Sequence, residues 1–160
     1  MHDGDEVVTL SQDFSFENYK EAFERLDFIK TLGYPFDLER IDVQKERVFY
    51  IPEMMPYVKG LRILRCGLYM GDMKKNRFEP SQSLAMFLKK EQFPNVLDLQ
   101  VTDERVVKYL KGETIELTDE ENQMCKNGIC LICVDGFSLG FGKLNNGTMK
   151  NKYLPGWRWM

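Results

Sequence analysis

The chain has 160 residues, of which 43% are apolar and 12% aromatic, and this composition excludes wholesale disorder and allows one domain or two small ones. Its net charge of −3 is unevenly distributed, because residues 61–100 and 123–160 are basic while the remainder is acidic. No apolar run approaches the roughly 18 residues of a membrane span, and the acidic N-terminus does not resemble a signal peptide. We therefore expect a cytoplasmic protein with local basic faces and no membrane partner.

Three elements are predicted in the first 70 residues. An amphipathic helix runs from Ser15, a favourable N-cap, to about Thr31. Its apolar side chains recur every three or four residues: Phe16, Tyr19, Phe23 and Leu26. A short strand follows at Arg47–Ile51, and a longer strand at Leu61–Met70 has two largely apolar faces, which is typical of a central strand. Arg65 in this strand would require a carboxylate or phosphate partner, because a buried unpaired charge is very unfavourable.

A basic segment, Lys74–Ser81, is predicted to be a loop that leads into a helix. Pro80 suits the beginning of a helix, and the apolar stripe of that helix is Leu84, Phe87 and Leu88. The cationic side chains of the loop are Lys74, Lys75 and Arg77. They allow two interpretations that the spacing does not separate: a charged turn in which Arg77 pairs with Glu79, or a clamp for a phosphate group.

The next segment favours an α+β arrangement. Phe93–Asn95 has the composition of a linker, and Val96–Val101 is predicted to be a strand. Thr102 is the expected N-cap of a short helix that ends at Gly112. A capping box predicts one more helical turn, with Thr118 and Glu121 as its two members.

The chain closes with two predicted hairpins. An apolar strand at Ile129–Val134 is followed by the turn sequence Asp135-Gly136 and by a return strand at Phe137–Lys143. A second turn at Asn145–Gly147 leads to a third strand at Met149–Tyr153.

Alternation along the return strand predicts one face of small side chains. That face holds Ser138, Gly140 and Gly142, and the other holds Phe137, Leu139, Phe141 and Lys143. A face without bulky side chains allows a helix, another strand or a ligand to approach the backbone closely. We treat it as a candidate surface for close approach of an RNA backbone.

Basic and aromatic side chains are concentrated in and after these hairpins. They are Lys143, Lys150, Asn151, Lys152, Tyr153, Trp157 and Arg158. Cations interleaved with aromatic rings suit a nucleic acid, through phosphate contacts and base stacking. The alternative interpretation is a solvated strand edge, which basic residues also protect against aggregation.

The four cysteines, Cys66, Cys125, Cys130 and Cys133, are predicted to be small buried apolar residues. Cys130 and Cys133 form a C-x-x-C, but they lie three residues apart in a strand and therefore face opposite sides of the sheet. The single histidine, His2, does not complete a zinc site, and we expect no metal.

Two segments carry a family resemblance: residues 61–88, LRILRCGLYMGDMKKNRFEPSQSLAMFL, and residues 134–158, which begin VDGFSLGFGK and end LPGWR. The first is similar to a motif that follows the catalytic domain in RsmF-like members of the Sun family of RNA cytosine-5 methyltransferases. Its matching residues are Leu64, Arg65, Gly67, Leu68, Gly71, Lys74, Arg77, Phe78, Glu79, Pro80 and Ser81, and Cys66 stands where the family has proline. The second resembles the PUA-like RNA-binding domain of the same proteins. The resemblance covers about residues 14–160.

The resemblance implies an α+β fold of two small packed units. Residues 1–95 would form a first post-catalytic domain, and residues 96–160 a PUA-like mixed β pseudo-barrel with short helices. The implied function is an RNA-binding module that positions ribosomal RNA for a methyltransferase domain, in cis or in trans. That other domain would bind S-adenosylmethionine. This chain lacks the Pro-Cys and Thr-Cys motifs of the catalytic domain, so we expect it to bind no cofactor and to catalyse nothing alone.

Two other functions compete with RNA binding. In the first, the chain is a structural module whose segment Lys74–Ser81 and first helix dock on the catalytic domain without contacting RNA. The second, an independent enzyme, is disfavoured because the sequence offers no defensible pair of carboxylates, nucleophile with its base, or metal cluster.

Overall fold

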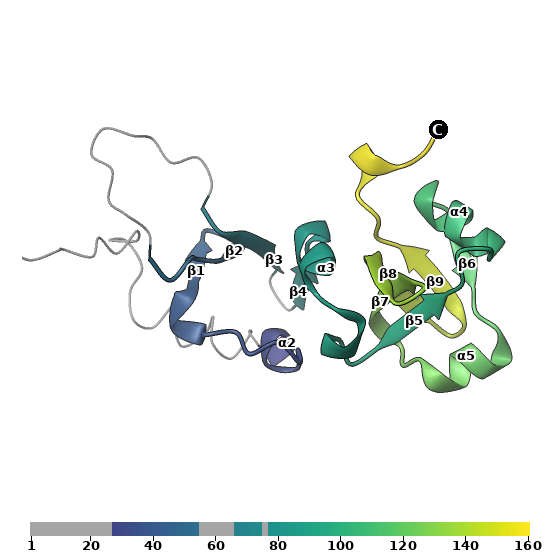
Figure 1. Cartoon of the computed structure of the whole chain (residues 1–160), viewed down its shortest axis with the longest axis horizontal. Helices are drawn as coiled ribbons and strands as arrows, with labels where there is room; N and C mark the ends of the chain where they lie inside the picture. Colours follow the sequence, from purple (N-terminus) through teal and green to yellow (C-terminus); the bar gives the residue numbers. More distant parts are fainter. Residues whose placement is uncertain (1–26, 55–65, 75–76) are drawn as a thin grey trace, which may run out of the picture.

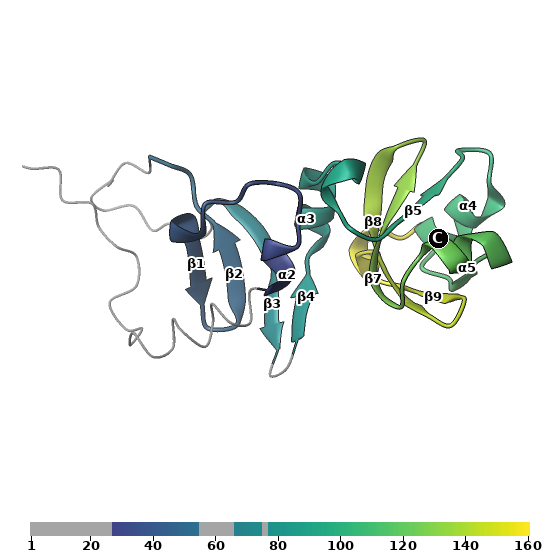
Figure 2. The same ribbon diagram turned by 90° about the horizontal axis from the view of Figure 1, so that it is seen from below.

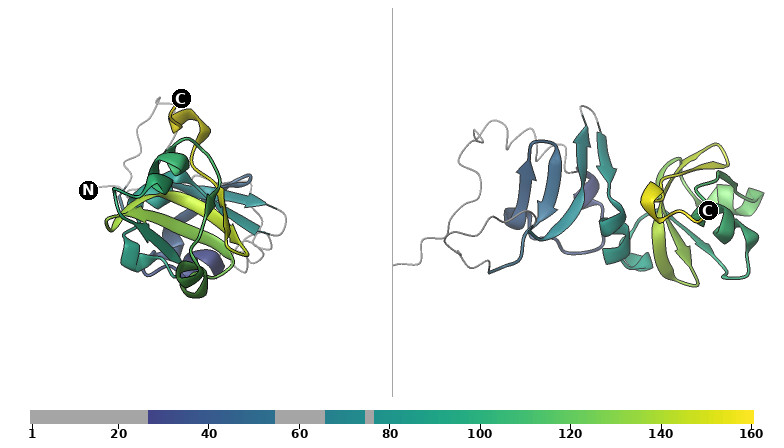
Figure 3. Two further views of the ribbon diagram at one scale, coloured as in Figure 1. Left: turned by 90° about the vertical axis from the view of Figure 1, so that its right-hand side faces the viewer. Right: turned by 90° about the horizontal axis from the view of Figure 1, so that it is seen from above.

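The computed structural model describes residues 27–54, 66–74 and 77–160, which form two β-sheets with short helices (Figure 1). The first sheet has the strand order β1-β2-β3-β4, and the second has the order β5-β7-β8-β9-β6. The sheets lie side by side along the long axis of the molecule, and the second curls into a half-barrel (Figures 1 and 3). The expected α+β fold is confirmed.

The first sheet is an antiparallel meander. Its strands are β1 (Ile41–Gln44), β2 (Arg47–Tyr50), β3 (Leu68–Lys74) and β4 (Arg77–Pro80), and β2 confirms the short strand that the sequence predicts. Helix α2 (Asp27–Lys30) and the 3-10 turn η1 (Leu38–Arg40) precede it. Helix α2 coincides with the end of the predicted first helix, whose earlier residues lie outside the described part of the chain.

The long strand predicted at Leu61–Met70 is displaced toward the C-terminus. Strand β3 begins only at Leu68 because Gly67 adopts a left-handed φ of 74°, which interrupts an extended conformation. Residues 61–65, including the predicted buried Arg65, lie outside the described part of the chain. The strand then continues to Lys74, which pairs with Arg77 of β4. The expected basic loop is therefore the end of a hairpin.

Helix α3 (Gln82–Phe87) lies between the two sheets and packs against both β3 and β8. Its N-cap is Ser81, so Pro80 precedes the cap as the last residue of β4 and lies outside the first helical turn. Leu84 and Leu88 are buried as the stripe predicts, whereas Phe87 is 39% exposed. The 3-10 turn η2 (Lys90–Gln92) follows.

The expected linker at Phe93–Asn95 is part of the packed structure. Phe93 is buried, and its ring contacts those of Phe28 and Phe141. The side-chain amide of Asn95 donates to the carbonyls of Lys126 and Ile129. These contacts fix the connection between the two sheets.

The second sheet contains one parallel pair, β5 with β7, and is otherwise antiparallel. Its elements are β5 (Val96–Leu99), α4 (Glu104–Leu110), β6 (Ile115–Glu116), α5 (Asp119–Met124), β7 (Gly128–Val134), β8 (Phe137–Asn145), β9 (Thr148–Asn151) and η3 (Pro155–Trp157). The N-cap of α4 is Asp103 in place of the expected Thr102, since the Asp103 carboxylate accepts from the amide of Arg105. The capping box of Thr118 and Glu121 is confirmed.

Both predicted hairpin turns are present. Asp135 and Gly136 have φ values of 48° and 83°, and Asn146 and Gly147 have values of 48° and 82°. Two consecutive positive φ values match the right-handed twist of the flanking strands. Strand β9 ends at Asn151, two residues before the predicted end.

A β-bulge changes which side chains share a face of β8. Ile132 pairs with Gly140 and Cys133 pairs with Ser138, so Leu139 lies in the bulge. Simple alternation therefore fails across this point. The Ser138 hydroxyl donates to the carbonyl of Leu88 at the end of α3, whereas Gly140 lies between Tyr109 of α4 and Gln82 of α3.

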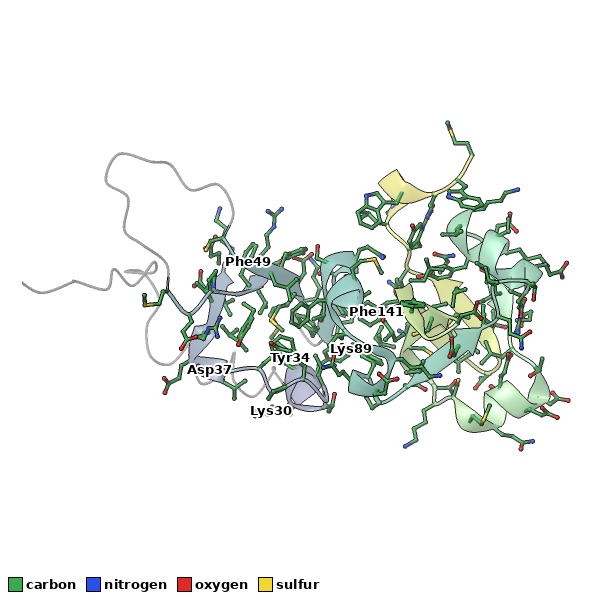
Figure 4. The ribbon with its side chains drawn as sticks, viewed as in Figure 1. Lys30, Tyr34, Asp37, Phe49, Lys89 and Phe141 are labelled. Atoms are coloured by element: carbon green, nitrogen blue, oxygen red, sulfur yellow. The ribbon has the colours of Figure 1, made fainter. Side chains whose placement is uncertain are left out.

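Two hydrophobic clusters occupy opposite faces of the second sheet. The first is shared with α3 and the first sheet and includes Leu84, Phe93 and Phe141; Figure 4 shows Phe141 on the side toward α3. The second lies under α4 and includes Tyr109 and Met149. The two cysteines of the C-x-x-C motif lie in different clusters, Cys133 in the first and Cys130 in the second, which confirms that they face opposite sides. Cys125 is buried as predicted, and Cys66 is half-buried.

The helices of the described residues are all too short or too polar to cross a lipid bilayer.

Candidate nucleic-acid interface

Three exposed lysines lie together on one face of the second sheet. Lys143 of β8 is directly opposite Lys150 of β9. Lys152 follows the last residue of β9, but its backbone amide donates to the carbonyl of Phe141 and so continues the pairing with β8, which places Lys152 on the face of Lys150. In the described part of the chain, no salt bridge involves any of these three side chains. We call Lys143, Lys150 and Lys152 the lysine face, and its uncompensated charge attracts anions.

The lysine face lies on the side of the sheet that packs against the first unit. Phe141 and Lys143 are two residues apart in β8 and share one face. Phe141 is buried against Phe93, while Lys143 is exposed beyond the packed region. The packing of Phe141 thus fixes the strand that carries Lys143.

Two predicted RNA-binding residues have structural roles. The Asn151 amide donates to the carbonyls of Tyr109, at 2.8 Å, and Glu113, at 3.0 Å, and its oxygen accepts from the amide of Tyr153. Tyr153 is only 8% exposed, and its ring packs on that of Tyr109 with centroids 5.4 Å apart. Asn151 and Tyr153 point toward α4, away from the lysine face. Tyr153 is therefore not available to stack on a base.

The expected close-approach surface is covered by the protein itself. A Cβ atom at Gly140 would collide with the Tyr109 hydroxyl, and one at Gly142 would lie 2.5 Å from the sulfur of Met149. Ser138 is engaged by α3, as described above. The small residues serve close packing of helices and a neighbouring strand, so the prediction that an RNA backbone approaches here is wrong.

The Tyr109 hydroxyl explains why β8 needs a glycine at position 140. It donates to the carbonyl of Phe141 at 2.8 Å, from a fully buried ring. Burial raises the pKa of Tyr109 well above its ordinary value, which keeps the hydroxyl a hydrogen-bond donor. Helix α4 is thereby bonded to the back of the strand that carries Lys143.

Arg158 and Trp157 lie apart from the lysine face. The guanidinium of Arg158 lies over Gly112 at the end of α4 and donates to the carbonyl of Tyr153 at 3.2 Å. Trp157 is 51% exposed, and Trp159, which the sequence reasoning missed, is also exposed. The amide of Trp159 donates to the carbonyl of Leu110, which ties the end of the chain to α4. The signal that could have identified both exposed tryptophans is the pattern Trp-Arg-Trp at residues 157–159.

The cations of the β3–β4 hairpin are ion-paired. Lys74 contacts Glu46 at 3.0 Å, and Arg77 contacts Glu79 at 2.7 Å, so the interpretation as a charged turn is confirmed for Arg77. The hydrogen bond that the Lys74 ammonium donates to the Glu46 carboxylate raises the pKa of Lys74. Lys75 lies outside the described residues. Exposed ion pairs of this kind are weak, so a phosphate can compete for these cations.

The two basic hairpins reach the same edge of the molecule. In Figure 2 the paired ends of β3 and β4 and the turn between β8 and β9 both lie along the lower edge, with β3–β4 running across the long axis and β8–β9 slanting along it. The right-hand view of Figure 3 shows the same edge from the opposite side. Lys74 and Arg77 flank the first end, and Lys143 and Lys150 flank the second. The fold thus places two patches that are about 70 residues apart in sequence along one edge of the molecule.

Lys126 is a further cation at this end of the second sheet. It is exposed in the loop before β7, and its backbone amide and carbonyl are both bonded to the side chain of Asn95. The adjacent Asn127 forms two hydrogen bonds with Asn146 in the β8–β9 turn. The sequence gives no local signal that this loop returns beside the turn.

The strongest charge network lies elsewhere and is saturated. Arg105 donates to the carboxylates of Asp103 and Glu121, with its closest contacts at 2.7 and 2.6 Å. These bonds raise the pKa of Arg105 and lower the pKa of Glu121. The network joins α4 to α5, and its single cation is fully engaged by the two carboxylates and therefore does not attract an anionic ligand.

Two family models match consecutive parts of the chain. The model described as the RsmF rRNA methyltransferase first C-terminal domain matches residues 27–88, which contain the first sheet and α3. The model described as the methyltransferase RsmF PUA domain matches residues 95–159, which contain the second sheet and its helices. The expected order of the two units is confirmed. Because α3 and Phe93 pack on both sheets, a division at residue 95 stays a prediction.

Proposed function

We propose a function from the family of this chain, which corresponds to the C-terminal domains of RsmF-like rRNA methyltransferases. In this proposal the chain holds ribosomal RNA in position while a separate cytosine-5 methyltransferase domain modifies the RNA. The two matching units are the C-terminal domains of such an enzyme, and a PUA-like domain implies RNA binding. Three parts of this function are proposed: that the chain holds the RNA in position, which residues contact the RNA, and that a methyltransferase domain is the partner.

The lysine face is the observation that carries this proposal. Like charges directly opposite each other on neighbouring strands are destabilising. Lys143 and Lys150 have this arrangement, and Lys152 adds a third cation to the same face. A polyanion relieves the repulsion, since phosphate groups neutralise the lysines and release counterions from the RNA.

The fold presents these lysines on a rigid support. Helix α4 is bonded to β8 through the Tyr109 hydroxyl, and α3 is bonded to it through Ser138. The β8–β9 turn is held by Asn127. Binding therefore requires ordering of the lysine side chains only, which lowers the entropic cost of association.

The cysteines support a division of labour between this chain and a catalytic domain. A cysteine nucleophile reacts as the thiolate. Burial raises the pKa of Cys133 to about 11 and that of Cys130 further, so both thiols are protonated at neutral pH. We propose that catalysis and S-adenosylmethionine binding belong to the methyltransferase domain, in cis or in trans.

Docking without RNA contact is the second candidate, and the ion pairs of the β3–β4 hairpin favour it. Because Lys74 and Arg77 are paired with Glu46 and Glu79, this hairpin carries charges of both signs, which suit a protein surface better than a polyanion. In this version the first unit binds the methyltransferase domain and sets its angle.

A binding assay separates the two candidates. The chain is titrated with a fluorescent ribosomal RNA fragment at low salt and, separately, with an isolated methyltransferase domain of the same family. RNA holding predicts saturable RNA binding that weakens steeply with salt. Absence of RNA binding at low salt, together with tight association of the methyltransferase domain, would favour docking.

A further inference from the structure

We infer that both basic hairpin ends contact one continuous RNA, and that Gln82 and Ser138 are positioning residues that set the separation of the two contacts. This inference rests on the proposed function. It specifies the ligand as an RNA element long enough to reach both units at once, instead of a short segment that occupies the lysine face alone.

The shared edge of the two hairpins is the first observation. The paired ends of β3 and β4 and the β8–β9 turn lie along the same edge of the molecule when it is seen from below (Figure 2) and from above (Figure 3, right). The lysine face also lies on the side of its sheet that packs toward the first unit. An RNA held by the lysine face can therefore run along the molecule to Lys74 and Arg77.

The second observation is that the two units are locked together around α3. The Gln82 amide donates to the carbonyl of Leu139 at 2.8 Å, and the Ser138 hydroxyl donates to the carbonyl of Leu88 at 2.6 Å. The bulge at Leu139 places both bonds at one point of β8. The rings of Phe93 and Phe141 lie beside this point, with centroids 5.3 Å apart.

The connecting segment adds no hinge among the described residues. The backbone carbonyl of Gln92 in η2 accepts a hydrogen bond from the amide of Gly33 at 2.8 Å, and Asn95 is bonded to the loop before β7. These contacts fasten the connection to the first unit at one end and to the second unit at the other. The hairpin ends are thus held at a fixed separation, as two linked binding sites must be if one ligand is to engage both.

Gln82 has a feature that sets it apart as a positioning residue. Its side-chain oxygen is buried and has no hydrogen-bond partner among the described residues, while its nitrogen is bonded to Leu139. A buried acceptor without a donor is unfavourable. The cost of burying this amide is explained if its donated bond fixes the angle of α3 against β8.

A rigid pair of sites predicts a dependence on RNA length. When one ligand engages both ends, the second contact is intramolecular and raises the apparent affinity by about 10²-fold or more. A single-stranded RNA of about five nucleotides occupies one site only. A ribosomal RNA hairpin with a stem of about 16 base pairs or more presents successive grooves and can reach both.

The test compares these two RNAs on three versions of the full chain. In the wild type, the long RNA should bind about 10²-fold more tightly than the short RNA. Lys74→Ala with Arg77→Ala should remove most of this advantage and leave binding of the short RNA unchanged. Gln82→Ala with Ser138→Ala should reduce the advantage about tenfold although no cation is lost.

Matched controls keep the outcomes distinguishable. Ser83→Ala with Gln100→Ala removes the same side chains from exposed positions and should change neither affinity. Thermal unfolding verifies that each variant is folded. The inference is overturned if the long RNA binds no better than the short one, or if the Gln82 and Ser138 changes weaken both RNAs equally. If Lys143→Glu with Lys150→Glu leaves binding of the short RNA intact, the proposed function itself fails.

Discussion

Lys143 of β8 faces Lys150 of β9 directly across the strand pair, with Lys152 on the same face. Each position was free to hold an acidic residue that would stabilise the hairpin, and the neighbouring strand pair β6–β9 does place a polar partner, Glu116, opposite Thr148. The lysine face therefore lowers the stability of the β8–β9 hairpin and concentrates positive charge on one surface, in agreement with the proposed RNA contact.

Replacement of Lys150 by glutamate tests this exchange. The change Lys150→Glu converts a repulsive cross-strand pair into an attractive one and should raise the free energy of unfolding by about 0.2–1 kcal/mol. RNA affinity should fall at the same time. Urea denaturation and fluorescence anisotropy measure the two effects. Lys152→Glu serves as the control, because it weakens RNA binding without a directly opposed lysine.

The glycine at position 140 is predicted to be a packing requirement. Gly140→Ala should destabilise the protein by about 1–3 kcal/mol, since the added methyl group would displace the buried Tyr109 hydroxyl. Gly156→Ala is the matched control, because no atom lies within 4 Å of the position its Cβ would occupy. Equal stabilities of the two variants in thermal denaturation would contradict the close packing of α4 on β8.

The Arg105 network predicts a pH dependence of stability. The hydrogen bond from Arg105 lowers the pKa of Glu121 below its ordinary value of 4.5. A carboxyl group whose pKa is lower in the folded than in the unfolded protein stabilises the folded state. This stabilisation is fully present above the pKa of the unfolded state, and it is lost as the pH falls through the pKa of the folded state. Glu121→Gln should therefore destabilise at pH 7 and have a much smaller effect well below pH 4. Urea midpoints at both pH values measure this.

The neighbouring residue supplies a control for that experiment. Glu120 is exposed in the same helical turn. Glu120→Gln removes an equal charge without disturbing Arg105, so its effect on the urea midpoint should be small at both pH values. A large, pH-dependent loss in this variant would assign the effect to the total charge of α5 instead of the Arg105 network.

Local signals were sufficient for much of the fold. The turn at Asp135 and Gly136 and the capping box of Thr118 and Glu121 depend on neighbouring residues only, and both are confirmed. The bulge at Leu139 could not be predicted from local sequence. It lies where α3 packs against β8, and the residues in contact there are about 50 positions apart in the chain. The displaced β3 has a local cause, the left-handed Gly67, which alternation of apolar residues does not reveal.

The candidate site was predictable to a smaller extent. The sequence identifies cations but does not reveal which of them are paired, so Lys74 and Arg77 appeared equivalent to Lys143 and Lys150. Aromatic residues are ambiguous for the same reason, since Tyr153 is buried by Tyr109 from a distant helix. The position of the two hairpins along one edge of the molecule depends on the packing of α3 and has no counterpart in local sequence.

The salt dependence of RNA affinity tests the central claim most directly. Wild type is compared with Lys143→Glu/Lys150→Glu and with Lys108→Glu/Lys111→Glu, which makes the same charge change in α4 and at its C-cap, at the other face of the sheet. If the lysine face holds phosphates, the slope of log K against log salt falls by about 1.5–2 in the first variant and stays nearly unchanged in the second. Equal slopes and affinities in wild type and the first variant would contradict the account.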